Sequence, residues 1–291
     1  MTEPKRVLVV GATGHQGGAV ARLLLEQGHR VRALTRNPES PGAVALKDSG
    51  AEVVPADLED GDSLARAFEG VDSAFAMATP FEAGPEAEVR QGENIVAAAK
   101  AARIQHLVYS SVASADRSTA IPHFDSKAEI ERQIESAGVP YTIVAPVYFM
   151  ENLFAPWTLP ELQSGRLSMA LPADRVLQQI AVPDIASFAV LALAKPDRFL
   201  GKRVDIAGDE VTGDEAAEIL SQAAGRKIEY VEIPADQRVA MGDDFKRMLD
   251  WFDETGYDVD LATQRSEYPE VTWTSYRDWA QAQDWSVLDR G

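Results

Sequence analysis

A glycine-rich turn near the N-terminus constrains the fold of this chain more than any other feature of its sequence. The turn has the sequence Gly11-Ala-Thr-Gly14-His-Gln-Gly17-Gly18, between an apolar β-branched run at residues 7–10 and an amphipathic helical pattern at residues 18–27. At a strand-to-helix turn, small residues let a pyrophosphate group approach the backbone. Gly11 permits the tight turn, Gly14 leaves room for the pyrophosphate, and Gly17 lets the helix pack close to the strand.

The backbone N–H groups that open the following helix are expected to face the anion, and the helix dipole favours its negative charge. A glycine turn with a purely structural role is the alternative. We predict that the turn binds a dinucleotide through the residues Gly11, Thr13, Gly14, His15, Gln16 and Gly17.

The first half of the chain alternates between strand-like and helix-like patterns. After the glycine turn, strands are expected at residues 30–34, 51–54, 73–77, 106–110 and 141–145, and helices at 43–49, 62–69, 86–102 and 124–137. Such alternation indicates parallel strands joined by crossover helices. We therefore predict an α/β fold with a doubly wound parallel sheet of the Rossmann type, which binds its ligand at the carboxyl ends of the strands.

Beyond Pro146 the patterns weaken, and prolines and glycines interrupt residues 156–172. Helical segments are expected at residues 184–194, 213–224, 245–252 and 273–285. We interpret residues 1–150 as a nucleotide-binding Rossmann domain. Residues 151–291 are expected to form a smaller mixed α/β lobe that binds a substrate or partner, rests on the strand carboxyl ends and completes the same folding unit.

Charge and composition exclude several classes of function. The formal net charge is −18, and an acidic surface repels phosphate backbones and anionic lipid, so we expect no direct nucleic-acid binding and no membrane association. The acidity suits solubility or a basic protein partner. The chain has no cysteine, and its four histidines lack the i, i+4 pairing of a metal site, so no metal is expected.

The chain shows no sign of targeting to a membrane. Its first residues lack the apolar segment of a signal peptide. The longest uncharged run, residues 136–150, is interrupted by Pro140 and Pro146 and is shorter than the ~20 apolar residues of a spanning helix. We expect a cytoplasmic protein, and the sequence leaves a homodimer open.

The end of the second predicted strand indicates which dinucleotide binds. An NAD site places an acidic residue about 20 residues beyond the glycines. Here Thr35 and Arg36 occupy that place, and the nearest acid is Glu39. A guanidinium there can bind a 2′-phosphate through charge-assisted hydrogen bonds. We therefore predict NADP(H), with an exposed arginine of no specific role as the alternative.

Four stretches of the sequence, in this order, resemble the NmrA-like family of atypical short-chain dehydrogenase/reductases. The G-x-x-G-x-x-G spacing of the turn is similar to that of the extended and atypical groups of these enzymes. The four stretches are the turn itself, Leu34-Thr-Arg-Asn-Pro38, Pro122-His-Phe-Asp-Ser-Lys127 and Tyr148-Phe-Met-Glu-Asn-Leu153. The resemblance covers nearly the whole chain.

The resemblance implies a binding role for several further residues. It places Arg36 on the 2′-phosphate, Asp57 and Leu58 beside the adenine, and Lys127 on the nicotinamide ribose. Helix capping by Asp57 is an alternative. Ala78 and Thr79, after the fourth strand, are expected near the adenosine ribose and pyrophosphate.

The segment that follows the sixth strand is expected to contact the nicotinamide end of the cofactor. Tyr148 and Phe149 follow this strand, where the backbone contacts the carboxamide. Phe149 and Asn152 are candidates for the face above the ring, and Trp157 for a substrate or partner groove. Ordinary packing is the alternative for these side chains.

The catalytic residues depart from the pattern of short-chain reductases. These enzymes use a tyrosine four residues before a lysine, together with a serine; the lysine charge lowers the pKa of the phenol, which then donates a proton. Lys127 is present here, but His123 occupies the tyrosine position. A histidine can act as a proton donor, although beside Lys127 we expect it to be neutral and a weaker acid. Ser110 and Ser111, at the end of the fifth strand, are the candidate serines, with turn capping as their alternative.

Two functions from different classes follow. The missing tyrosine favours an NADP(H)-binding sensor, in which nucleotide occupancy changes the affinity for a protein partner, as the resemblance to NmrA-like regulators implies. The alternative is an NADPH-dependent oxidoreductase that passes hydride directly to a small-molecule acceptor such as a quinone.

Overall fold

A computed structural model describes residues 4–289, which divide into two compact units. The first unit comprises residues 4–118, 122–145 and 185–205. The second comprises residues 119–121, 146–184 and 206–289. Each unit has its own β-structure and its own hydrophobic core.

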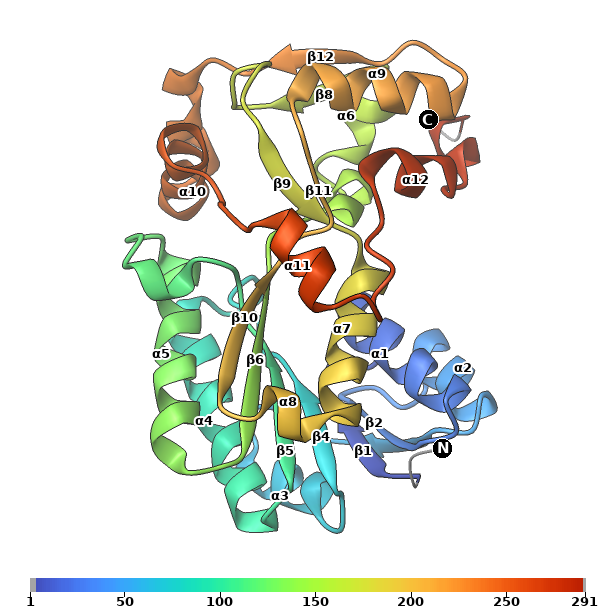
Figure 1. Ribbon diagram of the computed structural model, residues 1–291, viewed down its shortest axis with the longest axis vertical. Helices are drawn as coiled ribbons and strands as arrows, with labels where there is room; N and C mark the ends of the chain where they lie inside the picture. Colours follow the sequence, from blue (N-terminus) through green and yellow to red (C-terminus); the bar gives the residue numbers. More distant parts are fainter. Residues whose placement is uncertain (1–3, 290–291) are drawn as a thin grey trace. The chain divides into compact units, whose positions relative to one another are not determined.

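A parallel sheet forms the centre of the first unit. Within the described residues its seven strands follow the order β10-β6-β5-β4-β1-β2-β3 (Figure 1). All five pairs among the first six strands are parallel. The strands are β1 (Arg6–Val9), β2 (Arg30–Thr35), β3 (Glu52–Pro55), β4 (Ser73–Ala76), β5 (His106–Ser110), β6 (Tyr141–Pro146) and β10 (Lys202–Ile206). The strand order reverses between β1 and β4, and such a switch point is where open α/β sheets bind ligands.

Helices cover both faces of this sheet (Figure 1). One face carries α1 (His15–Glu26), α2 (Pro41–Asp48) and α7 (Val182–Ala194), and the other α3 (Gly61–Phe68), α4 (Pro85–Ala102) and α5 (Pro122–Ala137). Two short helices complete the unit, η1 (Ala115–Arg117) and α8 (Pro196–Phe199). Because both faces are covered, β4 and β5 are buried along their whole length. The predicted doubly wound Rossmann-type sheet is confirmed.

Most expected elements of the first unit shift by one or two residues at their ends, but helix α1 differs in a way that matters. It begins at His15, three residues earlier than expected, with Gly14 as its N-cap residue. The glycines therefore do not merely precede the helix. Gly17 belongs to its first turn, where the helix lies closest to the strand.

The second unit is a smaller mixed α/β structure, as expected for the second lobe. The domain boundary at residue 150 and the binding role of the lobe stay predictions. One sheet has the order β11 (Asp209–Val211), β9 (Leu177–Ile180) and β7 (Tyr148–Phe149), and contains parallel and antiparallel pairs. The other pairs β12 (Glu229–Glu232) with β8 (Arg166–Met169) in parallel. The helical segments are η2 (Met150–Phe154), α6 (Leu159–Gln163), α9 (Gly213–Ala224), η3 (Ala235–Met241), α10 (Asp243–Glu254), α11 (Leu261–Glu267), α12 (Tyr276–Gln281) and η4 (Trp285–Asp289).

The prediction of a single helix over residues 273–285 is wrong. Helix α12 begins only after Ser275, because the Ser275 hydroxyl accepts the N–H of Asp278 and caps the helix there. The helix ends at Gln281, and Trp285 opens the separate short helix η4. Within residues 4–289, no helix is both long and apolar enough to cross a bilayer.

Candidate functional site

The glycine turn at residues 11–17 forms a cradle in which one position, Gly17, admits no side chain. Gly11 adopts a φ of +67°, which favours glycine, and its carbonyl oxygen accepts the N–H of Gly14 at 2.9 Å. A Cβ on Gly17 would lie 2.3 Å from that same carbonyl oxygen and 2.7 Å from the carbonyl oxygen of Val10. Because both obstacles are backbone atoms, position 17 requires glycine as long as α1 packs this close to β1.

The N-terminus of α1 is open at this cradle. Gly14 has no side chain to cap the helix, and the first N–H groups of a helix have no intrahelical partner. Thr13, Gly14 and His15 are exposed. The side chain of Gln16 is buried instead, where its Oε1 accepts the Ser110 hydroxyl at 2.7 Å and links α1 to the end of β5. An exposed, uncapped helix N-terminus suits an anion such as a pyrophosphate.

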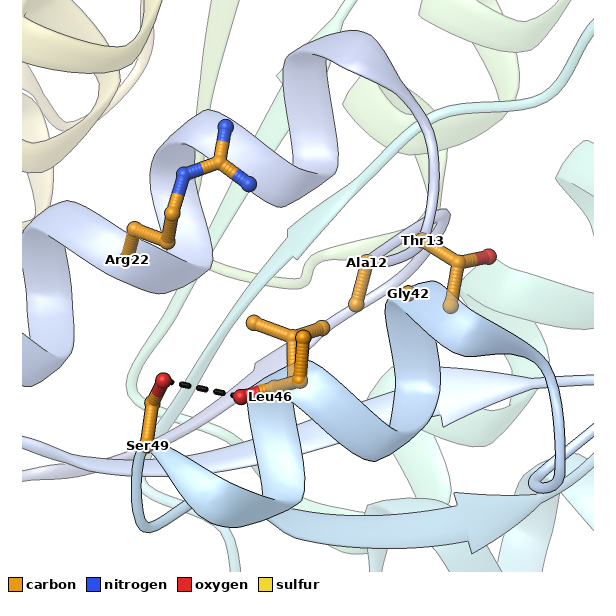
Figure 2. Close-up of a pocket in the computed structure, with 7 residues that line it drawn as sticks. Ala12, Thr13, Arg22, Gly42, Leu46 and Ser49 are labelled. Atoms are coloured by element: carbon orange, nitrogen blue, oxygen red, sulfur yellow. Dashed lines mark hydrogen bonds between the residues drawn. The ribbon is translucent and has the colours of Figure 1, made fainter.

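A cavity between α1 and α2, lined in part by the turn, is too small for a nucleotide. Its volume is about 110 Å³, against roughly 300–1,000 Å³ for typical ligand pockets. The residues that line it are Ala12, Thr13, Arg22, Gly42, Ala45, Leu46 and Ser49 (Figure 2). The candidate site is the exposed N-terminus of α1, of which this cavity can hold only a part.

Arg36 lies at the end of β2, where the sequence predicts it, but it has a partner that the sequence did not indicate. Its Nη1 and Nη2 donate to the two carboxylate oxygens of Glu82 at 2.7 and 3.0 Å. Hydrogen bonding with Glu82 raises the pKa of Arg36, and hydrogen bonding with Arg36 lowers the pKa of Glu82. The side chains remain 63% and 58% exposed, respectively, so the pair lies in solvent.

The structure decides one alternative for Asp57. The capping residue of α3 is Asp60, whose carboxylate accepts the N–H groups of Asp62 and Ser63, so Asp57 does not cap this helix. The Asp57 carboxylate is exposed and accepts the N–H of Glu59. Leu58 is partly buried against the core of the unit. The contact of these two residues with adenine stays a prediction.

Lys127 is held in a buried ion pair. Its Nζ lies 2.8 Å from Oε1 of Glu88, on the neighbouring helix α4, and donates to the carbonyl oxygen of Ala78 at 2.6 Å. The lysine side chain is 10% exposed and the glutamate side chain is fully buried. Burial alone would lower the pKa of Lys127, but Tyr109 and Glu88 raise it above its ordinary value. The lysine therefore carries its charge at neutral pH.

Close packing of α4 on α5 brings the two members of this pair together. One turn further along α4, a Cβ on Gly92 would lie 2.5 Å from Ile130 of α5. Glu88 also accepts the hydroxyl of Ser126. Tyr109 lies beneath the lysine, whose Nζ is 5.6 Å from the ring centroid. Burial raises the pKa of Tyr109 to about 12, against the opposing effect of the Lys127 charge.

His123 lies near the start of α5 in an aromatic group. Its ring centroid is 6.0 Å from that of Phe81 and 4.8 Å from that of Phe124, which it meets edge to face. Phe81 belongs to the loop between β4 and α4 and is 69% exposed. Thr79 lies in the same loop and accepts the N–H of Phe81. An aromatic side chain thus stands in solvent beside the position that a tyrosine occupies in short-chain reductases.

Ser111 is engaged in a structural network. Its buried hydroxyl donates to Glu131, which also accepts Nε of Arg203 at 2.8 Å. Burial raises the pKa of Glu131, against the Arg203 charge. A catalytic role of Ser111 stays a prediction, and it would require this network to open.

The remaining predicted residues lie in the second unit. Burial raises the pKa of the Tyr148 phenol, against a hydrogen bond with Asn152. The Tyr148 ring packs edge to face on Phe252, with centroids 6.3 Å apart. Phe149 is partly buried, and Trp157 is 70% exposed. Their roles toward a ligand stay predictions.

Sequence reasoning missed Glu82 and Glu88. Glu82 precedes the helix predicted over residues 86–102 and Glu88 lies in its first turn, where acidic residues are typical of a solvated surface, and both partners lie far away along the chain. Sequence reasoning expected no metal site. Within residues 4–289, no cluster of three or more histidine or acidic side chains could hold a metal ion.

The strand order, the glycine cradle and the open helix N-terminus define a Rossmann-type α/β protein. The chain belongs to the NmrA-like family, whose model matches residues 3–281.

Relatives and solved structures agree with this membership. Over 232 residues the chain is 33% identical to an NAD(P)H azoreductase from Xenophilus azovorans, covering 79% of this chain and 78% of the relative. Citrobacter sp. triphenylmethane reductase complexed with NADP(H) superposes with a TM-score of 0.77 at 22% sequence identity. This match covers 96% of this chain and 100% of the reductase. NmrA, a negative transcriptional regulator, in complex with NAD superposes with a TM-score of 0.81 at 20% sequence identity. This match covers 98% of this chain and 99% of NmrA. At these identities the two structures show the shared fold.

Proposed function

We propose that this protein binds NADP(H) at the β1–α1 turn and acts as a reductase that passes hydride to an acceptor without a tyrosine proton donor. The observation that carries nucleotide binding is the cradle itself. Position 17 excludes every side chain, and the helix N-terminus beyond it is exposed and uncapped. These are the requirements of a pyrophosphate site.

The residues of the first unit fit NADP(H) from the adenosine end inward. The N–H groups that open α1 would hold the pyrophosphate, and Arg36 the 2′-phosphate. Asp57 and Leu58 would flank the adenine, and the small residue Ala78 leaves room near the ribose. When bound, the nicotinamide supplies a hydride.

The local chemistry favours an acceptor that takes its proton from water. His123 stands where a reductase would have its tyrosine, and the Lys127 ammonium is engaged by Glu88 and the carbonyl of Ala78. The charged lysine can still favour a nucleotide hydroxyl nearby, but it activates no phenol four residues earlier. A quinone accepts hydride at a conjugated system and forms an oxygen anion, so it needs little help from a protein acid.

The names of similar proteins support this reading. An NAD(P)H azoreductase is 33% identical to this chain, and a triphenylmethane reductase and an Escherichia coli NADPH-dependent quinone oxidoreductase share its fold. Each is described as reducing a conjugated compound or a quinone.

A nucleotide-sensing regulator is the second candidate, and it is the one that the sequence favoured. The missing tyrosine supports it, as does the fold shared with NmrA, a negative transcriptional regulator. The formal net charge of −18 favours a basic protein partner over direct contact with DNA.

One experiment separates the two candidates. NADPH binding is measured by calorimetry, and loss of nicotinamide absorbance is followed with quinones, azo dyes and triphenylmethane dyes. The reductase predicts turnover with at least one acceptor, retained in His123→Ala. Binding without turnover across the panel would favour the regulator, and absence of binding to any nicotinamide nucleotide would reject both.

A further inference from the structure

We infer that Glu82 sets the preference of this site between NADP(H) and NAD(H). Its carboxylate competes with the 2′-phosphate for Arg36 and is itself available to the ribose hydroxyls of NAD(H). This inference rests on the proposed function, because it concerns the adenosine end of the same nucleotide site.

The contact between the two side chains is specific. Both guanidinium Nη atoms donate to Glu82, one to each oxygen, across a sequence separation of 46 residues. Two parallel N–H···O bonds are also the geometry in which arginine binds phosphate. A 2′-phosphate that approaches this face of Arg36 therefore meets a carboxylate already in its place.

The pair can open, because it is not part of the core. Each side chain is more than half exposed, and Glu82 lies in the loop between β4 and α4. Exposed pairs of this kind contribute little to stability. Glu82 is therefore positioned to leave Arg36 when a phosphate arrives, at a modest cost in affinity.

The Glu82 carboxylate supplies the acidic group that is missing after β2. NAD sites hold the ribose 2′-hydroxyl with an acidic residue after the second strand. Here Arg36 and Asn37 follow that strand, and an acid arrives beside it from a different loop. A carboxylate accepts hydrogen bonds from a ribose diol but repels a phosphate. Glu82 thus favours NAD(H) and disfavours NADP(H), whereas Arg36 does the opposite.

The test is Glu82→Gln, which removes the charge and keeps the shape of the side chain. We expect NADPH affinity to rise about two- to fivefold, the range that an exposed ion pair allows, and NADH affinity to fall. Because the pair is exposed, the gain should shrink as salt is added. Glu86→Gln is the matched control, since Glu86 is an exposed glutamate in the first turn of α4 and its substitution changes the net charge equally.

Calorimetry with NADPH and NADH gives the outcome. In the background of Arg36→Ala, where no guanidinium is left to compete for, Glu82→Gln should raise NADPH affinity less than it does in the wild-type background. If Glu82→Gln and Glu86→Gln behave alike in the wild-type background, the inference is overturned while nucleotide binding stands. If the wild-type protein binds neither nucleotide, the proposed function fails, and this inference with it.

Discussion

Replacing Gly17 with alanine tests whether the closeness of α1 to β1 creates the nucleotide site. The new Cβ would lie 2.3 Å from the carbonyl oxygen of Gly11, whereas ordinary van der Waals contact begins at 3.4 Å. The first turn of α1 must therefore move by about 1 Å. Overpacking of this kind costs about 1–3 kcal/mol, and at about 2–4 °C per kcal/mol the melting temperature should fall by roughly 2–12 °C.

The same movement should weaken nucleotide binding more than it weakens the fold. The N–H groups that would hold the pyrophosphate belong to the displaced turn. A hydrogen bond to a charged group contributes about 1.5–3 kcal/mol, so losing one should reduce NADPH affinity roughly 10- to 150-fold. Calorimetric titration with NADPH and thermal unfolding by circular dichroism measure the two effects.

Gly61→Ala provides the matched control. Gly61 opens α3, and a Cβ there would meet no atom within 4 Å. This variant should bind NADPH as the wild type does and be equally stable, or more stable by about 0.4–1 kcal/mol because its unfolded chain is less flexible. A Gly17→Ala protein that melts and binds NADPH like this control would refute the reasoning.

Two further predictions concern buried charges. Glu88→Gln leaves the Lys127 ammonium buried without its counter-charge, so the free energy of unfolding measured in urea should fall by about 3–5 kcal/mol. Adding Lys127→Met should restore much of the lost stability. Equal losses in the single and double variants would contradict this prediction. Burial raises the pKa of Asp184, against its two hydrogen bonds from Thr274, so the folded chain retains a proton that the unfolded chain releases. The contribution of Asp184 to stability should therefore fall as the pH rises above about 4. Asp184→Asn should remove this contribution from the stability curve, and an unchanged slope in the variant would reject this assignment.

The sequence was most informative where the cause of a structure is local. The glycine turn could be predicted from its own residues, because steric clash within a few residues allows only glycine at position 17. Strand and helix periods in residues 7–145 were also predictable, since strands buried on both faces are continuously apolar. The start of α1 was misplaced because a glycine-rich first turn has poor helix propensity, which tertiary packing overrides.

The short strands of the second unit illustrate the opposite case. β7 has two residues and β11 has three, too few for a period-two pattern to emerge. In the first unit, β10 contains Lys202, Arg203 and Asp205, and was not expected as a strand either. It lies at the edge of the large sheet beside β6, where charged residues are tolerated. Partners distant in sequence, not local pattern, define these strands.

By itself the sequence determined the glycine cradle, the doubly wound sheet and the guanidinium at the end of β2, because each depends on the sterics or periodicity of neighbouring residues. Only the tertiary structure decided what Arg36 and Lys127 contact. Their partners, Glu82 and Glu88, lie in the loop after β4 and in the helix α4 that follows it. This connection leads from β4 to β5. Charge attraction acts through space, so a linear pattern cannot show which acid will meet which base.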